Sequence, residues 1–151
     1  MKIYRATLDE LDSTALLFDK YRQFYEQAPD YDGCRDYLQA RLENDESVIF
    51  VAQDGSGKLV GFTQLYHTFC SVARAPIIQL YDLFVDSPAR RQGIGRSLMN
   101  QATAYAKASG ASRLQLETGI ENRQAQALYE SLGYERDVRF YTYHLVDIHN
   151  E

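Results

Sequence analysis

The sequence contains little cysteine and no long apolar run. Cys34 and Cys70 are its only cysteines, too few for a disulfide scaffold and without the spacing of a zinc site. No run approaches the roughly 18 consecutive apolar residues of a membrane-spanning helix, and residues 1–7 lack the apolar core of a signal peptide. We therefore expect a cytoplasmic protein in which both cysteines are packing residues.

Positive charge is also scarce. The chain has 16 lysines and arginines against 21 acidic residues, a net charge of −5, which argues against a general nucleic-acid binder and weakly favours a cationic substrate. It contains no repeats, low-complexity segments or breaks in composition. With 45% hydrophobic residues in 151, it can bury one substantial core, so we expect a single domain over residues 1–151.

Hydrophobic periodicity predicts a mixed sheet flanked by helices. A capping box at Thr7 and Glu10 should open the first helix, which ends near Ala28, and this helix and the next should form a flap over the sheet. A strand-helix-strand crossover should be parallel and right-handed. Gly61 should mark a bulge or a close approach. The expected strands are 2–7, 47–53, 59–70, 77–85, 113–118 and 139–146, and the other expected helices are 33–44, 94–109 and 122–132.

A basic glycine turn lies between the expected strand 77–85 and the helix that follows. Gly93 and Gly95 lack the Cβ atoms that would keep a phosphate away from the backbone, and the helix begins there with unpaired N–H groups. The turn has neither the Lys-Ser/Thr pair of a P-loop nor the third glycine of a dinucleotide fingerprint. It is therefore either a pyrophosphate cradle, with charge from Arg90, Arg91 and Arg96, or only a tight connection.

A second segment, Asn122 to Tyr134, favours the interpretation of the glycine turn as a pyrophosphate cradle. Together the two segments resemble the GNAT family of acetyl-CoA-dependent N-acetyltransferases. Arg90 to Gly95 matches that family's Arg/Gln-x-x-Gly-x-Gly/Ala motif, and Asn122 to Tyr134 matches its Asn-x-x-Ala-x-x-Leu-Tyr-x-x-x-Gly-Phe/Tyr motif. The resemblance covers roughly residues 47 to 146.

The resemblance implies the mixed α/β (α+β) GNAT fold: a central, mostly antiparallel sheet of about seven strands, with a splayed parallel pair and about four flanking helices. It implies that acetyl-CoA is the co-substrate and that no metal is used. The pantetheine would pair with the backbone between the splayed strands, and the glycine turn would hold the pyrophosphate. The implied cofactor-binding residues are Leu83, Phe84, Val85, Arg90, Arg91, Gln92, Gly93, Ile94, Gly95, Arg96, Asn122, Ala125 and Tyr129.

The implied reaction is direct attack of a neutral primary amine on the thioester in a ternary complex. A general acid is then needed at the departing sulfur. Tyr129 occupies the family's position for that acid, although a core tyrosine would fit the same pattern. The backbone N–H of Val85 could stabilise the oxyanion.

The strand Leu80 to Val85 resembles most closely the branch of polyamine (spermidine/spermine) and fungal histone acetyltransferases. That branch has Leu-Glu-Asp where this chain has Leu80-Tyr81-Asp82, so Tyr81 replaces the glutamate expected as base. Asp82 is a candidate catalytic residue that could hold a substrate ammonium, unless it is merely solvated or salt-bridged. The expected substrate-binding residues are Asp82, Tyr81, Tyr21, Tyr25 and Glu117, with Phe24 as a further aromatic candidate.

The expected acceptor is a polyamine-, lysine- or aminoglycoside-like small molecule, with no nucleic-acid or membrane partner. A non-catalytic acyl-CoA-binding module and a protein or peptide acetyltransferase are the alternatives. His67 is an outside candidate for the base, and no motif supports a Cys70 nucleophile. The tyrosine-rich strand 139–146 could close its own sheet or join a homodimer.

Overall fold

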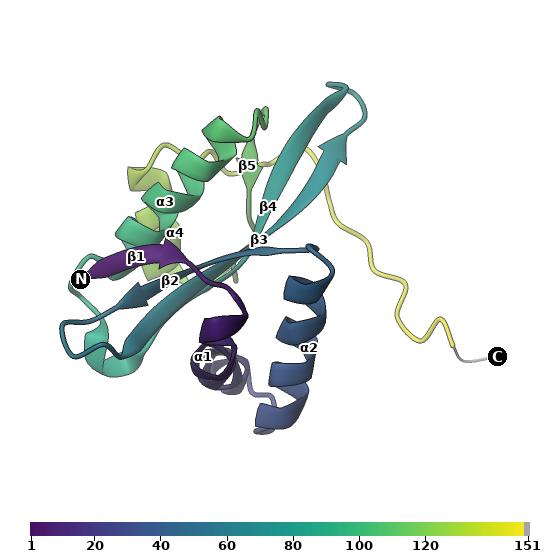
Figure 1. Cartoon of the computed structure of the whole chain (residues 1–151). Coiled ribbons are helices and arrows are strands. Elements are labelled where there is room, and N and C mark those ends of the chain that lie inside the picture. The colour runs from purple at the N-terminus through teal and green to yellow at the C-terminus, as the bar shows by residue number, and fades with distance from the viewer. Residues whose placement is uncertain (150–151) are drawn as a thin grey trace. The chain divides into compact units, whose positions relative to one another are not determined.

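A computed structural model of the chain describes residues 1–149. These form two units, Met1–Glu117 and the unit that begins at Thr118, and each is described by itself. The first unit holds a five-stranded sheet in the order β1-β2-β3-β4-β5 and three of the four α-helices (Figure 1). The mixed α/β architecture predicted from the sequence is confirmed, with fewer strands than expected.

The sheet is antiparallel except at one edge. The first four strands are joined as antiparallel neighbours, and β5 is parallel to β4, as a strand-helix-strand crossover requires. β-branched and aromatic residues dominate β2, which is buried on both faces. The strands are β1 (Lys2–Arg5), β2 (Val48–Gln53), β3 (Leu59–Cys70), β4 (Ala75–Val85) and β5 (Leu114–Gln115).

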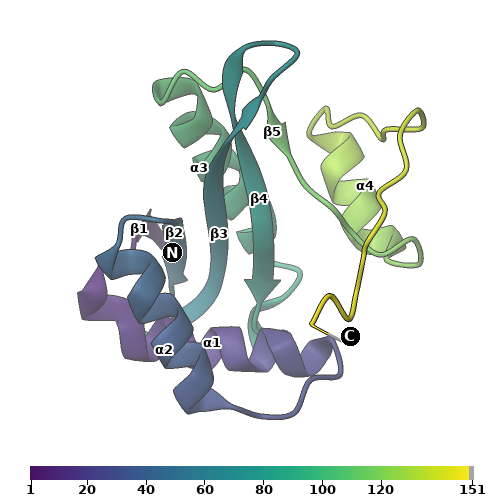
Figure 2. The same cartoon turned by 90° about the vertical axis from the view of Figure 1, so that its right-hand side faces the viewer.

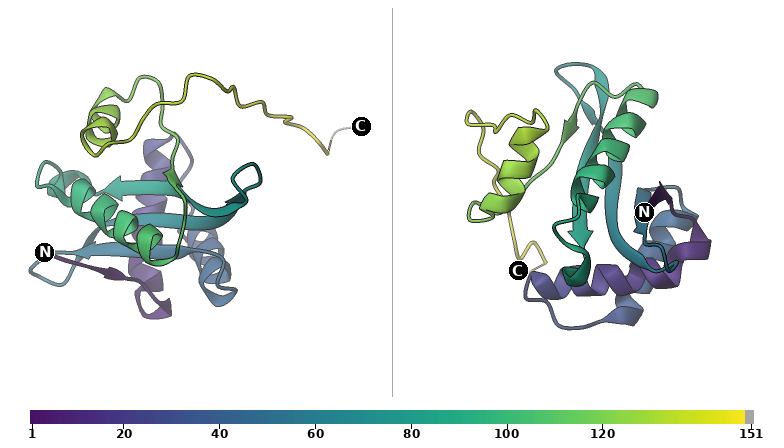
Figure 3. Two further views of the ribbon diagram at one scale, coloured as in Figure 1. Left: turned by 90° about the horizontal axis from the view of Figure 1, so that it is seen from above. Right: turned by 90° about the vertical axis from the view of Figure 1, so that its left-hand side faces the viewer.

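Helices cover both faces of this sheet. α1 and α2 lie on one face and α3 lies on the other, as the views in Figure 3 show. The flap-side core contains Ala15 and Leu17 of α1, Leu38 of α2 and Phe62 of β3. The helices are α1 (Leu11–Phe24), α2 (Tyr31–Glu43), α3 (Ile94–Ala108) and α4 (Arg123–Ser131), and the short 3-10 turns are η1 (Leu8–Glu10) and η2 (Ser87–Ala89). Within the described residues, no helix has the length and apolar character needed to cross a membrane.

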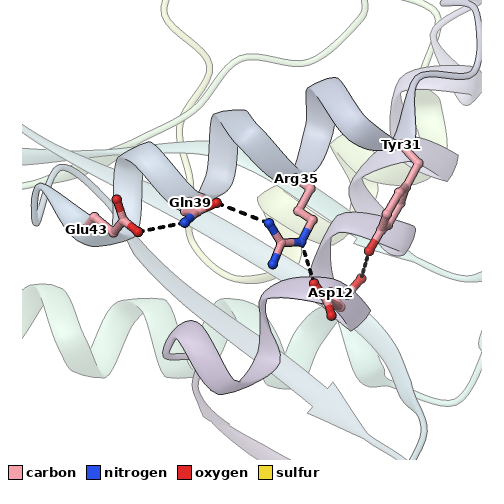
Figure 4. A network of polar contacts seen from close by, with 5 residues as sticks. All are labelled: Asp12, Tyr31, Arg35, Gln39 and Glu43. Atoms are coloured by element: carbon pink, nitrogen blue, oxygen red, sulfur yellow. Dashed lines mark hydrogen bonds and ion pairs between the residues drawn. The ribbon is translucent and has the colours of Figure 1, made fainter.

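A chain of polar side chains joins the two flap helices (Figure 4). Arg35 of α2 donates to the Asp12 carboxylate of α1 at 2.6 Å and to the Gln39 carbonyl oxygen at 3.1 Å. Gln39 in turn donates to Glu43 at 2.7 Å. Such exposed contacts add little stability individually. The Arg35–Asp12 pair joins α2 to α1, whereas the contacts of Gln39 with Arg35 and Glu43 lie within α2.

Two caps decide where these helices start. The predicted capping box at Thr7 and Glu10 is present, but it opens η1, and α1 begins only at Leu11. The Asp30 side chain accepts a hydrogen bond from the Gly33 N–H at 3.0 Å, so α2 begins at Tyr31 rather than at Gly33. The sequence interpretation overlooked this aspartate cap.

The prediction of about seven strands is wrong, because the structure has five. The strand expected over 113–118 pairs only at Leu114 and Gln115. The strand expected over 139–146 is absent from the described structure, and Tyr141 and Tyr143 there are 89% and 90% exposed. Alternation describes a side-chain pattern, whereas a strand also needs a partner for its backbone.

Candidate functional site

One half of β4 has an open backbone edge. β5 pairs with β4 only at Ile78 and Gln79, and Figure 2 shows β5 beside one half of β4 and diverging from the other. Among the described strands, none covers Leu80–Val85 on that side. These N–H and C=O groups can therefore pair with an extended ligand that carries amides. Leu83, Phe84 and Val85, the residues predicted to bind pantetheine, lie on this edge.

A β-bulge divides the two halves of β4. Gln64 of β3 pairs with Asp82, and the next residue, Leu65, pairs with Leu80, so Tyr81 is the extra residue. The bulge reverses the alternation of side chains along β4. Asp82 therefore faces the flap with Phe84, whereas Leu80 faces the opposite side of the sheet together with Leu65.

The glycine turn lies against the end of this open edge. Gly93 has φ 77° and begins α3 without a side-chain cap, and a Cβ built on it would meet no atom within 4 Å. Arg91 also has positive φ, at 65°. The first turn of α3 contains no acidic residue, so its positive dipole end and the neighbouring arginines favour an anion.

Close packing at Gly61 holds the turn in place. Gly61 pairs with Val85, and a Cβ on Gly61 would lie 3.1 Å from the Phe84 carbonyl oxygen, 3.3 Å from Leu98 and 3.4 Å from Ile94. The predicted close approach at Gly61 is confirmed. It brings the start of α3 directly onto the sheet beside Val85, so the glycine turn lies next to the end of the open edge.

Two basic side chains, those of Arg90 and Lys20, contact residues at and just beyond the end of β4. The Arg90 guanidinium donates to the Val85 carbonyl oxygen at 2.9 Å and lies 5.6 Å from the ring centroid of Phe84 and 5.8 Å from that of Phe24. Lys20 of α1 forms an ion pair with the buried Asp86 at 3.1 Å. The aromatic faces at the end of β4 therefore already accept one cation.

Asp82 is a buried carboxyl on the flap side of the sheet. It is 6% exposed, and the Gln64 amide nitrogen donates to its Oδ2 at 2.9 Å. Burial raises the pKa of Asp82, while hydrogen bonds from Gln64 and from the Tyr21 hydroxyl lower the pKa and only partly offset that effect. Asp82 is therefore buried from solvent and forms no ion pair with any residue in 1–149, so neither ordinary alternative for it applies.

Aromatic rings surround this carboxyl. Tyr21 of α1 packs edge-on against Phe62 at 5.8 Å, Phe84 at 6.0 Å and Tyr25 at 5.1 Å between ring centroids. Tyr25 and Phe24 remain 50% and 57% exposed. The structure thus brings the predicted Tyr21 to Asp82 and places Tyr25 at the outer side of the same aromatic group.

Three site residues were missed by the sequence interpretation: Gln64, Tyr66 and Tyr37. The Tyr66 hydroxyl lies 2.7 Å from the Tyr37 hydroxyl of α2, and the Tyr66 ring lies 5.4 Å from that of Tyr81. Burial, and then the hydrogen bond with Tyr37, raises the pKa of Tyr66. A signal existed, because Phe62, Gln64 and Tyr66 alternate along one strand and Gln64 interrupts an otherwise apolar or aromatic face.

Other candidates lie apart from Asp82. Glu117 is exposed beyond the end of β5, and no contact among the described residues joins it to Asp82. His67 contacts the Tyr105 hydroxyl of α3 at 2.7 Å, on the opposite face of the sheet. Arg113 donates to the Cys70 sulfur at 3.6 Å, and Cys34 is buried. Across residues 1–149, no three His, Cys, Asp or Glu side chains form a group suited to a metal ion.

The second motif lies in the second unit. The Asn122 side chain caps α4 by accepting a hydrogen bond from the Ala125 N–H at 3.2 Å, which gives the Asn-x-x-Ala spacing a local structural reason. Tyr129 is half-buried, with its ring 6.1 Å from that of Tyr134. The roles predicted for Asn122, Ala125 and Tyr129 in binding and catalysis stay predictions.

Comparison with known proteins gives consistent matches. Residues 13–134 match the model of the Acetyltransferase (GNAT) family. The chain is 47% identical over 143 residues to the uncharacterized N-acetyltransferase YhfO of Bacillus subtilis (strain 168), covering 95% of both chains. A crystal structure of a probable acetyltransferase superposes with a TM-score of 0.90 at 38% identity, covering 96% of this chain and 97% of that one.

A further solved structure carries a named ligand. It is an aminoglycoside acetyltransferase from an uncultured soil metagenomic sample in complex with sisomicin, with a TM-score of 0.77 and 25% identity. The match covers 95% of each chain.

Proposed function

Because the chain belongs to the acetyltransferase (GNAT) family and is an acetyl-CoA-dependent N-acetyltransferase of that type, we propose that its acceptor is the primary amine of a small or medium-sized cationic molecule. The observation that carries this proposal is the buried carboxyl of Asp82 among aromatic rings, beside an open strand edge. A carboxyl and several ring faces together suit an ammonium group.

The residues of the first unit fit acetyl-CoA as the donor substrate. The outward-facing N–H and C=O groups of Leu83–Val85, where Arg90 already donates to the Val85 carbonyl, would pair with the pantetheine amides, and the N–H groups at the start of α3, with Arg91, would hold the pyrophosphate. The open space at Gly93 lets phosphate oxygens reach the backbone. Acetyl-CoA supplies an activated thioester, and this surface would orient it along β4.

Asp82 would bind the substrate ammonium and accept a proton from it. An alkyl ammonium has a pKa of about 10.4, so the amine needs help to become nucleophilic at neutral pH. Burial raises the pKa of Asp82, which makes its carboxylate a stronger base than an exposed one. Asp82 thus offers a base even though Tyr81 replaces the glutamate of the polyamine branch. Tyr129 would protonate the departing sulfur.

The finer substrate class is part of the proposal. Polyamines, lysine derivatives and aminoglycosides all present primary ammonium groups, and the similar structure with sisomicin is an aminoglycoside acetyltransferase. The polyamine branch is supported by the motif around Asp82 alone. A cytoplasmic location, a homodimer and the absence of nucleic-acid and membrane partners stay predictions.

The test measures release of the coenzyme A thiol from acetyl-CoA with spermidine, cadaverine, lysine amide, an aminoglycoside and a histone-tail peptide. Calorimetric acetyl-CoA binding is measured alongside. We expect turnover of at least one small amine, and a selective loss of cationic substrates in Asp82→Asn but not in Asp36→Asn, an exposed aspartate of α2.

Each other outcome would redirect the proposal. Binding without turnover of any amine would favour an acyl-CoA-binding module, and turnover of the peptide alone would favour a peptide acetyltransferase. Absence of acetyl-CoA binding would refute the role of the glycine turn.

A further inference from the structure

Gln64 makes a contact that the proposed chemistry does not yet use. Its side chain is fully buried, its amide nitrogen donates to Asp82 at 2.9 Å, and its amide oxygen has no hydrogen-bond partner. A buried amide oxygen without a partner costs free energy. A leucine or methionine would fill a similar space without that cost, so the glutamine calls for a reason.

We propose that Gln64 is the positioning residue that lets Asp82 gain and lose a proton inside the protein. The Gln64 amide donates a hydrogen bond to the Asp82 carboxylate and, after a half-turn, accepts one from the Asp82 carboxylic acid. A rotation of 180° about the Cγ–Cδ bond exchanges the amide nitrogen and oxygen. One hydrogen bond to Asp82 is then kept in both protonation states. The Gln64 amide oxygen, which has no hydrogen-bond partner among the described residues, becomes the acceptor when Asp82 is protonated.

The backbone supports this pairing. Gln64 and Asp82 are direct partners across β3 and β4, at the residue pair next to the bulge. The hydroxyl of Thr63 donates to the Asp82 carbonyl oxygen at 2.8 Å. Backbone and side chain of Asp82 are thus held by adjacent residues of β3, so the carboxyl can change its charge without changing its place.

The proton transfer that this arrangement serves is simple. An N–H bond of the substrate ammonium breaks, its electron pair stays on nitrogen, and the proton forms an O–H bond on Asp82. The amine becomes nucleophilic, and the carboxylic acid donates its new hydrogen to the turned Gln64 amide. This proton transfer depends on the proposal above that Asp82 binds the substrate ammonium and accepts its proton. The hydrogen bond between Gln64 and Asp82 does not depend on that proposal.

Few other groups near the pair change charge in the same pH range. Tyr21 of α1 donates a hydrogen bond to Asp82, Tyr66 of β3 interacts with Asp82 electrostatically and contacts the Tyr81 ring, and burial raises the pKa of Tyr66. Beyond Tyr66 lie Tyr37 and Arg41 of α2, with Arg41 4.6 Å from the Tyr37 ring and paired with Glu46 at 3.0 Å. Tyrosine and arginine side chains ordinarily titrate well above a carboxyl, and following the assigned signal of Asp82 alone separates it from other carboxyls such as that of Glu46.

The test is a titration of Asp82 by carbon NMR in protein labelled at aspartate carboxyls, with its signal assigned by its loss in Asp82→Asn. In Gln64→Met both the hydrogen bond to the carboxylate and the one to the carboxylic acid are gone. Because a hydrogen bond to a charged group is the stronger of the two, we expect the titration midpoint of Asp82 to rise by about one pH unit, a tenfold shift in its protonation. Gln53→Met is the matched control, because the Gln53 side chain donates to the hairpin carbonyl of Gly57 at 3.0 Å, and the Asp82 midpoint in this variant should equal that of the parent protein.

A second variant keeps the test decisive if Gln64→Met does not fold. Gln64→Glu places two carboxyls at hydrogen-bond distance, so the pair should titrate in two separated steps, the upper one above the parent midpoint. An unchanged midpoint in folded Gln64→Met, or independent titration in Gln64→Glu, would overturn the inference.

Turnover separates this inference from the proposed function. For any amine in the panel that the parent protein acetylates, the acidic limb of the pH dependence of kcat/KM should move upward in Gln64→Met by the same shift as the NMR midpoint. A shifted NMR midpoint with no shift in that limb would overturn the catalytic part alone. If no amine is acetylated, the proposed function fails and the NMR titration still decides whether Gln64 controls Asp82.

Discussion

Gly93 and Gly110 offer a matched test of the anion-binding turn. Gly93 begins α3 with φ 77°, and Gly110 follows its last turn with φ 76°; a Cβ on either would meet no atom within 4 Å. Alanine at either position therefore adds no clash and leaves only the cost of the left-handed backbone, about 1–2 kcal/mol. For a domain of this size, each variant should lose roughly 2–8 °C in Tm.

The two variants should differ in acetyl-CoA affinity. In Gly93→Ala the methyl group occupies the space through which a phosphate would reach the N–H groups of the first turn. Loss of one hydrogen bond to a charged group costs about 1.5–3 kcal/mol, which is a weakening of at least about tenfold in Kd. Gly110→Ala should bind as the parent protein does, because it lies at the opposite end of α3.

Isothermal calorimetry with acetyl-CoA and thermal unfolding by circular dichroism check both quantities on the same preparations. Equal stability losses together with a Kd of Gly93→Ala within about twofold of the parent value would refute the reasoning, since the factor of about ten expected from one lost hydrogen bond would be missing. The positive φ would then serve only the connection between strand and helix.

Three further predictions follow from other positions. Tyr129→Phe should lower kcat about 100-fold or more with little change in the Kd of acetyl-CoA, as steady-state kinetics and calorimetry would check; unchanged kcat would make Tyr129 a packing residue. Asp82→Asn should raise the free energy of unfolding at neutral pH. Burial raises the pKa of Asp82 in the folded protein, so the parent protein loses stability as pH rises through that pKa. The extra free energy of unfolding of Asp82→Asn over the parent protein should therefore shrink toward pH ~4, as urea titrations would show. Gly61→Val should destabilise by about 1–3 kcal/mol or more in the same assay, because its Cβ would lie 3.1 Å from the Phe84 carbonyl oxygen of β4 and 3.3 Å from Leu98 of α3; wild-type stability would show that both β4 and α3 can move away.

Local signals predicted much of the fold. Thr7 with Glu10 and the glycine turn each act over a few residues, and the structure contains both. The strand expected over 139–146 fails for a different reason. Its aromatic alternation is a property of the segment, whereas pairing depends on another part of the chain, which no local pattern specifies.

The candidate site was predicted only in part, because some of its residues are identified by contacts between distant parts of the chain. Asp82 and Tyr21 were found by motif and by composition, and the structure brings them into hydrogen-bond contact. Gln64 was missed because its importance depends on its contact with Asp82 on the neighbouring strand, which the sequence around Gln64 does not specify. The bulge at Tyr81 could not be seen either, since uninterrupted alternation would place Leu80, Asp82 and Phe84 on one face.

The extra residue at Tyr81 also determines how β4 tolerates insertions and deletions. The hairpin beyond the bulge, with its tip at residues 71–74, could lengthen or shorten by one residue on each strand while Gln64 stayed opposite Asp82. Deletion of Tyr81 would give a regular ladder in which Leu80 still lies opposite Leu65 and Asp82 still lies opposite Gln64, so no side chain would change face. Natural length variation in relatives should therefore be found at the hairpin tip and at the bulge position.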